Sequence, residues 1–297
     1  MTRDAAPAPV HLSFDGPPGV LRSMGLALLP RPEMPTPLVP PMRGAWHGII
    51  PGRLVPPSVL RELRPMEGGA AHPVLLHAGT MRLMMALLTH PRFPVPIWNI
   101  LQVRNSIRIH RAVPAEDPLE AVAEFAGQRK VEKGLEVDLR VHLLRGDHAV
   151  QESLTVFLVR GRSAGPGVAS STAPRVSATE EESLRILHKG ALGFGRLTGD
   201  FNGIHWWSRY ARNLGFQGAF SHPHRALARI LESLPGWEGR SGSLLEVWYK
   251  GPVYYDRDLR LSWSSDEGRT NFALRVGGDP RPAIAGTWTE GPERPPA

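Results

Sequence analysis

The residues best suited to chemistry are an aspartate, an asparagine and a histidine in the segment 194–211. Asp200, Asn202 and His205 lie within six residues, with a glycine before the aspartate and another after the asparagine. A carboxylate and an imidazole on such a bent loop can hold one water molecule between them. One group can take a proton from the water while the other delivers a proton to a substrate, which accelerates reactions by about 10²–10⁴-fold. The pattern therefore predicts general acid–base catalysis.

The same residues also fit a structural role. Asp200 or Asn202 can cap a helix that begins just after them, because short polar side chains accept hydrogen bonds from the first helical turn. His205 can be a surface histidine or a satisfied core histidine. A metal site that adds His222 and His224 is disfavoured, since histidines at i and i+2 do not share a helix face. We therefore expect no metal.

A wider set of positions resembles the motif of a known family. The matching positions are Phe194, Leu197, Thr198, Gly199, Asp200, Asn202, Ile204, His205 and Ala211, then Gly215, Phe216 and residues 219–222. At these spacings they resemble the signature of the MaoC-like (R)-specific enoyl-CoA hydratase family. The rest of the second half is similar to that family only in layout. The first half resembles the catalytically silent partner domain of double-domain members.

The resemblance implies a double hot-dog fold of the α+β class, in which each of two units wraps a curved antiparallel sheet around a long helix. It implies a 2-enoyl or (R)-3-hydroxyacyl thioester substrate, carried on CoA or acyl carrier protein, with no other cofactor. Asp200 and His205 would act on water to hydrate the double bond reversibly, with Asn202 helping to hold the loop. The implied substrate-binding positions are Gly199, Gly203, Ser221, His222, Pro223 and His224.

Two departures from the family pattern affect this chemistry. The family usually has proline where this chain has Gly203. It typically reads Ala-His-Gly-Met where this chain reads Ser-His-Pro-His over 221–224, and the glycine N–H usually polarises the thioester carbonyl. Pro223 has no N–H, and losing one such donor costs about 3 kcal/mol, or about 10²–10³ in rate. Two alternatives therefore stay open, a non-catalytic acyl-thioester-binding protein and a thioesterase.

The elements that must position these residues follow the same layout twice. A nearly all-apolar run predicts a buried helix over Val74 to Leu88. Strand patterns follow over 97–109, 121–125, 135–144 and 150–159, the last with Leu154, Val156 and Leu158 in phase. In the second half, a helix over Pro223 to Leu234 precedes strands over 244–249, 259–263, 272–276 and 283–289. Helix then antiparallel strands, twice, indicates a duplicated α+β layout.

Changes in composition give the expected boundaries. They predict a Pro-rich N-terminal arm over 1–45, a domain over 46–161, a linker over 162–181, a second domain over 182–292 and a tail over 293–297. The resemblance implies that the first domain is a non-catalytic hot-dog unit and the second the MaoC-like hot-dog unit. The linker prediction rests on small residues and prolines with no apolar period. Two fused units would make the monomer a pseudo-dimer, either alone or as a homodimer.

Composition limits the partners. The 297-residue chain has no cysteine and a net charge of +7, without a basic stripe that would indicate nucleic acid. No secretory leader pattern or membrane-spanning run is evident, so we expect a cytoplasmic protein. Some arginines near the motif are candidates for phosphate contacts with the substrate carrier, or for a solvated helix face. They are Arg209, Arg212, Arg225 and Arg229.

Overall fold

A computed structural model describes residues 9–30, 39–97, 100–160 and 167–291, so the tail predicted over 293–297 lies outside it. The strands are β1 (Val10–Phe14), β2 (Met42–Ile49), β3 (Ile100–Ile109), β4 (Leu119–Val131), β5 (Gly134–Arg145), β6 (His148–Arg160), β7 (Glu180–Leu184), β8 (Leu244–Tyr249), β9 (Leu259–Asp266), β10 (Arg269–Val276) and β11 (Ile284–Thr289). The helices are α1 (Val20–Ala27), α2 (Pro51–Leu54), α3 (Pro57–Leu60), α4 (Pro73–Leu88), α5 (Ala191–Thr198), α6 (Ser208–Asn213) and α7 (Pro223–Ser233), with single 3₁₀ turns η1 (Glu67–Gly69) and η3 (Gly203–His205).

The eleven strands form one sheet, in the order β1-β2-β4-β5-β6-β3-β8-β11-β10-β9-β7. The order is the same in the two halves. Apart from the additional edge strand β1, each half has five strands and places them, counted along the chain, first, third, fourth, fifth, second from the outer edge to the middle of the sheet. The halves meet where β3 pairs antiparallel with β8, from Arg104 opposite Trp248 to Arg108 opposite Leu244. The α+β class is confirmed, and the repeated layout predicted from the sequence is present.

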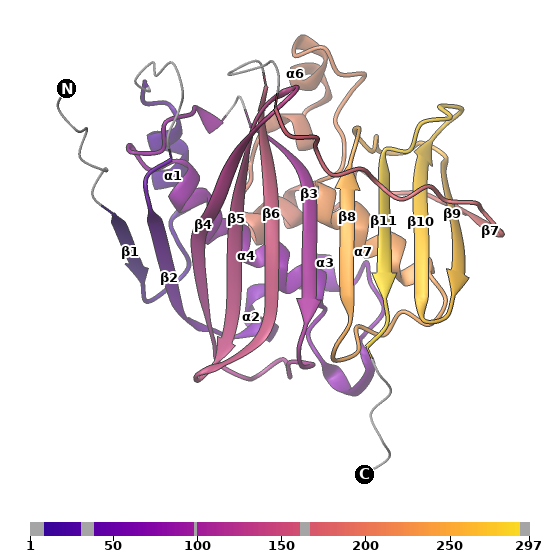
Figure 1. The fold of residues 1–297 in the computed structure, drawn as a ribbon, viewed down its shortest axis with the longest axis horizontal. Helices are drawn as coiled ribbons and strands as arrows, with labels where there is room; N and C mark the ends of the chain where they lie inside the picture. The colour runs from indigo at the N-terminus through magenta and orange to yellow at the C-terminus, as the bar shows by residue number, and fades with distance from the viewer. Residues whose placement is uncertain (1–8, 31–38, 98–99, 161–166, 292–297) are drawn as a thin grey trace.

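The two long helices, α4 and α7, lie on the same face of this sheet and contact each other (Figure 1). Helix α4 is buried on nearly every side, as its apolar sequence predicts. Both helices begin in the same way, with a histidine at the N-cap and a proline in the first turn, His72-Pro73 in α4 and His222-Pro223 in α7. Proline suits this position because its missing N–H has no helical partner there.

The segment predicted as a linker contains no helix or regular strand from 167 to 179. Its course passes across the outer face of the sheet toward β7 (Figure 1), with an isolated bridge between Val168 and Val131. Its last two predicted residues, Glu180 and Glu181, instead begin β7 and pair with β9. In the described part of the chain, no helix has the length and apolarity needed to cross a membrane.

Two features of the first half were not predicted. The arm predicted over 1–45 contains the strand β1, the helix α1 and the start of β2, and β1 extends the sheet by pairing in parallel with β2. The face of β6 that packs on the core is also not the one that carries Leu154, Val156 and Leu158. Its residues opposite the core face of β5 are Gln151, Ser153, Thr155, Phe157 and Val159. Polar residues occupy this core face because they bind partners inside it, so an apolar count selects the wrong face.

Candidate active site

The Asp200 loop begins where α5 ends. Gly199 ends the helix in a left-handed conformation with φ 74°, which glycine adopts without steric cost. The N–H of Asp200 donates to Thr198 Oγ1 at 3.1 Å. Arg82 of α4 donates through Nε to the carbonyl of Leu197 at 3.2 Å and through Nη2 to the carbonyl of Arg196. A side chain from the first half therefore binds the free carbonyls at the helix end.

The two oxygens of Asp200 have different partners. Oδ1 accepts the N–H of Asn202 at 2.9 Å, and Asn202 Oδ1 in turn accepts the N–H of Ile204 at 3.3 Å as the N-cap of η3. Oδ2 lies 3.5 Å from Nε2 of His205. The capping role and the chemical role considered for this segment therefore coexist, one on each oxygen of the carboxylate.

His205 is held in one orientation. Its Nδ1 lies 3.0 Å from the carbonyl oxygen of Phe220, and because a carbonyl can only accept, Nδ1 carries the hydrogen. In the neutral ring Nε2 then presents a lone pair toward Asp200 Oδ2. The histidine side chain is 7 % exposed and that of Asp200 is 30 % exposed. These two acceptor atoms, Nε2 of His205 and Oδ2 of Asp200, are close enough for one water molecule beside them to donate a hydrogen to each.

The carboxyl of Asp200 is held in its ionised form. Burial alone raises its pKa. When the imidazoles are protonated, the hydrogen bond and charge of His205 and the charge of His222, with the N–H of Asn202, hold that pKa well below its ordinary value. A carboxylate in this state is ionised at neutral pH and accepts hydrogen bonds, and its low pKa makes it a weak base.

His222 supports the pair from the side. Its ring stacks on the ring of His205 with centroids 4.0 Å apart, and Nε2 donates to the main-chain carbonyl of Asp200 at 3.1 Å. Burial, with the charges of His205 and Arg225, lowers the pKa of His222 to about 3 against the opposing charge of Asp200. His222 is thus neutral and acts as a spacer between the loop and the start of α7.

Asp200, His205 and His222 each offer one ligand atom within 4.8 Å of the others, a spacing that could hold a metal ion. The stacked imidazoles make the three atoms a poor ligand set. A histidine binds a metal with a lone pair in its ring plane, and the two planes are only 23° from parallel, so their lone pairs do not converge readily. His224, also considered for a metal site, bonds instead to Gln102.

The remaining predicted site residues fall into two groups. Gly203 lets the loop approach Tyr210, because a Cβ there would lie 2.7 Å from the tyrosine ring. Ser221 is buried and its hydroxyl donates to the carbonyl of His222. Pro223 occupies the first turn of α7 and His224 follows it, buried. The loop thus brings Asp200, Asn202 and His205 together, and residues 221–224 lie at the adjoining helix start.

Two of the arginines considered for phosphate binding have structural partners instead. Arg225 is buried, bonds through two nitrogens to the carboxylate of Glu62 and also donates to the carbonyl of Lys189. Arg229 bonds to the main chain of Glu62 and to Glu232. Both arginines fix α7 to the segment after α3, and Nη1 of Arg225 is left buried without a hydrogen-bond partner among the described residues.

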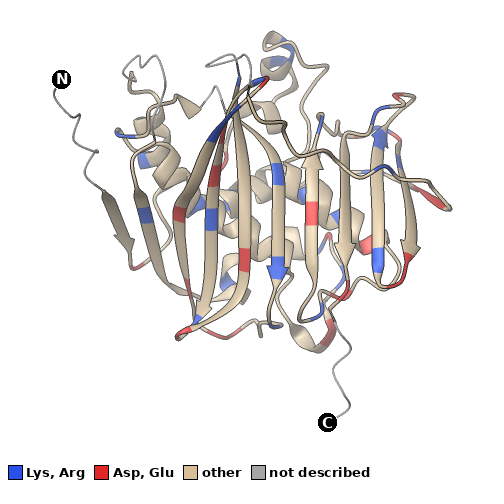
Figure 2. Ribbon diagram, viewed as in Figure 1, with Lys and Arg blue, Asp and Glu red and all other residues tan. Residues whose placement is uncertain are grey.

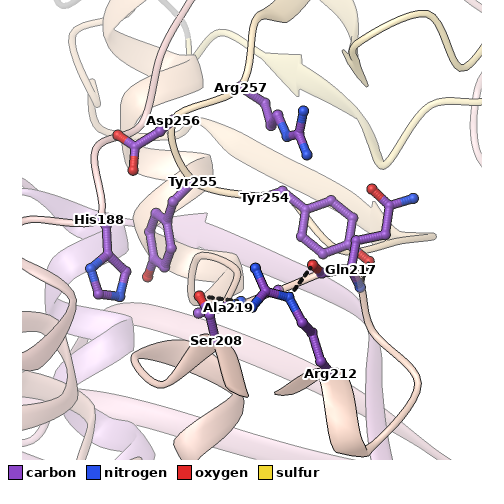
Figure 3. Close-up of a pocket in the computed structure, with 10 residues that line it drawn as sticks. His188, Ser208, Arg212, Gln217, Ala219, Tyr254, Tyr255, Asp256 and Arg257 are labelled. Carbon is purple, nitrogen blue, oxygen red and sulfur yellow. Dashed lines mark hydrogen bonds between the residues drawn. The ribbon is translucent and has the colours of Figure 1, made fainter. Parts of the chain in front are cut away.

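Arg212 lines a pocket of about 140 Å³ beside the Phe220 segment (Figure 3). Its Nε donates to the carbonyl of Gln217 at 3.3 Å, while Arg257 and Tyr254 line the same pocket. The Ala219 N–H donates to Ser208 Oγ in its wall. The lining residue Ala219 is therefore the immediate neighbour in the chain of Phe220, whose carbonyl orients His205.

Sequence analysis did not identify Arg82 as a contributor to the site. The available signal was its position, a charge within the otherwise apolar run of α4. A charged residue in an otherwise buried helix usually has a specific partner.

No protein-family model matches the sequence, and no curated protein matches it. Solved structures do match over most of the chain. HtdX of Mycobacterium tuberculosis shares 21 % identity with a TM-score of 0.66, covering 81 % of this chain and 95 % of that one. A MaoC-like dehydratase from Phytophthora capsici shares 15 % identity with a TM-score of 0.67, covering 84 % and 95 %. An acyl-ACP thioesterase from Bacteroides thetaiotaomicron shares 12 % identity with a TM-score of 0.51, covering 83 % and 97 %. The chain as a whole, like its 194–222 motif, therefore resembles the MaoC-like dehydratases, whose fold it has.

Proposed function

We propose that the protein hydrates a 2-enoyl thioester, or dehydrates the matching (R)-3-hydroxyacyl thioester, with Asp200 and His205 acting on a water molecule. The observation that carries the proposal is the pair of acceptors, Oδ2 and Nε2, that face each other 3.5 Å apart while their other atoms are occupied. The carrier of the thioester is CoA or acyl carrier protein, and no metal takes part.

The reaction balances with one mobile proton. As the water oxygen bonds to C3 of the substrate, one member of the pair takes a water proton, and that proton is returned to C2. The negative charge that develops meanwhile on the thioester oxygen needs a hydrogen-bond donor. The N-terminus of α7 is oriented to favour such a charge.

We further infer that the two halves are two hot-dog units, one over 46–161 and one over 182–292. The equal strand order and the equal His-Pro helix starts support this division. Only the second unit carries the Asp-x-Asn-x-x-His segment. The first unit contributes Arg82 and the neighbours of His224, so it completes the site rather than duplicating it.

The test is a hydration assay with short and long 2-enoyl-CoA substrates. Asp200→Asn retains an oxygen for the Asn202 N–H but removes the charge, and we expect turnover to fall by about 10²–10⁴-fold. His205→Ala should cause a loss of similar size. Asp147→Asn and His148→Ala serve as matched controls, because both residues are exposed, Asp147 in the turn between β5 and β6 and His148 as the first residue of β6.

Two other functions would give different results. A thioesterase, which the structural similarity to the acyl-ACP thioesterase favours, would release free thiol without consuming the double bond. A binding protein, which Pro223 favours, would bind the thioester and leave it unchanged. Equal hydration by the wild type and Asp200→Asn would rule out the proposed mechanism.

A further inference from the structure

A buried row of polar side chains joins the two halves beneath the sheet. This polar seam consists of His77 on α4, Gln102 and Asn105 on β3, Ser153 and Thr155 on β6, and His224 on α7. His77, Asn105, Thr155 and His224 are at most 2 % exposed. Polar groups so deeply buried are costly unless each is hydrogen-bonded, so the direction of each bond in the seam is informative.

The two amides on β3 donate the bonds, toward β6 and α4 on one side and toward α7 on the other. The amide nitrogen of Asn105 donates to Thr155 Oγ1 at 2.9 Å and to His77 Nε2 at 2.8 Å. The amide nitrogen of Gln102 donates to Asn105 Oδ1 and to His224 Nε2, the latter at 3.0 Å. His224 Nε2 is therefore an acceptor, and the single hydrogen of the neutral ring lies on Nδ1.

The ring of His224 is neutral. Burial and the charges of His77 and His222 hold its pKa well below the ordinary value, against the opposing charge of Asp200. A neutral imidazole with a fixed hydrogen is a suitable donor to an oxygen that gains negative charge, because it keeps its proton. Gln102 binds the other nitrogen, Nε2, so the fixed hydrogen of the His224 ring is the one on Nδ1.

The position of Nδ1 suits the site. Nδ1 is bonded to Cγ and so stays close to the main chain at the start of α7, while Nε2 reaches across to β3. His224 is the second residue of the helix, and His222, two residues before it, bonds to the main chain of Asp200. The hydrogen on Nδ1 thus lies at the helix start that adjoins the Asp200 loop, where Pro223 has no N–H to offer.

We propose that the Nδ1–H of His224 donates to the thioester carbonyl oxygen and supplies the contact that Pro223 cannot make. Gln102 is then a positioning residue, because its amide decides which ring nitrogen carries the hydrogen. This inference rests on the proposed hydration reaction. The proposed donor is the imidazole of His224, and the competing donor is the main-chain N–H of the same residue.

That competing donor has a parallel in the first half. In α4 the ring of His72 accepts the N–H of Val74, the residue after the proline, at 3.2 Å. In α7 the equivalent ring, His222, bonds to Asp200 instead, which leaves the N–H of His224 without a cap. A substitution of the His224 side chain separates the two donors, since it removes the imidazole and retains the main-chain N–H.

The first experiment combines His224→Ala with Pro223→Gly in the full chain. We expect His224→Ala to lower kcat by about 10²–10³-fold with a smaller change in KM, as for the loss of one donor to a developing oxyanion. Because Pro223→Gly restores an N–H at that position, the double variant should recover at least tenfold over His224→Ala. Thermal unfolding of every variant shows that each one folds.

The outcomes separate this inference from the function on which it rests. If His224→Ala turns over like the wild type while Asp200→Asn is inactive, the hydration mechanism stands and the imidazole is not the donor. If Asp200→Asn is also fully active, the proposed function itself fails. If Pro223→Gly does not improve His224→Ala, the two residues do not supply the same contact and the inference is overturned.

A second measurement does not depend on any variant folding. Nitrogen-15 NMR of histidine-labelled wild type reports the tautomer of each ring, and we expect the Nδ1–H form for His224. The Nε2–H form would overturn the proposal.

Gln102→Glu places a carboxylate at Nε2, which should draw the hydrogen to that nitrogen, shift the NMR signal accordingly and lower kcat more than KM.

Discussion

At Gly199 the backbone needs both a left-handed conformation and open space. Its φ is 74°, and a Cβ there would lie 3.1 Å from Cγ of Arg82 and 3.3 Å from Cγ2 of Val20. Alanine would therefore be strained twice, once by its own backbone and once by the neighbours that hold the loop. The geometry of this residue links the end of α5 to the orientation of Asp200.

We expect Gly199→Ala to lower the free energy of unfolding by about 1–2 kcal/mol from backbone strain alone, with a further loss from the contacts. Gly48→Ala is the matched control, because Gly48 has φ 70° but no atom within 4 Å of an added Cβ. Denaturant unfolding gives the free energy lost in each variant, and the difference between the two losses is the cost of the contacts with Arg82 and Val20. Equal losses in the two would mean that the Arg82 and Val20 contacts yield without cost.

At the scale of elements, the site depends on how α4 holds α5. Arg82 reaches from the first half to the last carbonyls of the short helix that precedes Asp200. Its partial burial lowers the pKa of its guanidinium, yet arginine stays charged at any working pH. A helix of eight residues has little stability of its own, so this contact decides where its end lies.

Replacing Arg82 with methionine should lower kcat roughly tenfold through a misplaced Asp200, because a catalytic group displaced by about 1 Å can cost up to 10²-fold. Arg82→Lys should retain part of the activity through a single donor. Arg196→Met is the control, since that side chain is exposed and only its carbonyl is used. Steady-state kinetics with a thermal-unfolding check would test this. A loss of stability with unchanged kcat would show that the contact supports only the fold.

At the scale of the whole molecule, the two halves share a sheet and a buried polar seam. The outer face of the sheet carries basic and acidic residues side by side rather than in a single-sign stripe (Figure 2). Pairs such as Arg129 with Glu136 and Asp138 account for part of this mixture. The seam is different, because it holds histidines that must stay neutral.

Acid should therefore weaken the junction between the halves. Burial lowers the pKa of His77 from 6.5 to about 4. Above pH 6.5 neither the folded nor the unfolded chain protonates this residue. Between pH 6.5 and 4 only the unfolded chain binds the proton, so stability falls as pH falls, by up to about 1.4 kcal/mol per pH unit for each such histidine.

Denaturant unfolding across this range should show the loss, and His77→Gln should reduce its slope by up to one proton. His148→Gln, which changes an exposed histidine, is the control and should leave the slope as in the wild type. An unchanged slope in His77→Gln would show that His77 is not kept neutral by the fold.

Local features of this protein were predictable from its sequence. The Asp200–Asn202–Ile204 turn is formed by neighbours two residues apart. Helix α4 follows from its nearly continuous apolar run, and α7 follows from its apolar periodicity. These depend on short-range geometry, which the order of residues specifies directly. The resemblance of residues 194–222 to a family motif added the expected pairing of Asp200 with His205, which lie close in the structure.

Other features were decided only by the tertiary structure. Arg82 binds a carbonyl 115 residues away, Gln102 meets His224 across 122 residues, and Arg225 pairs with Glu62 across 163. Such partners leave no periodic signal along the chain. The polar core face of β6 was not predictable for the same reason, since the partner of its buried Ser153 is His77, 76 residues away. Periodicity reports which positions are apolar, whereas packing decides which polar groups find a buried partner.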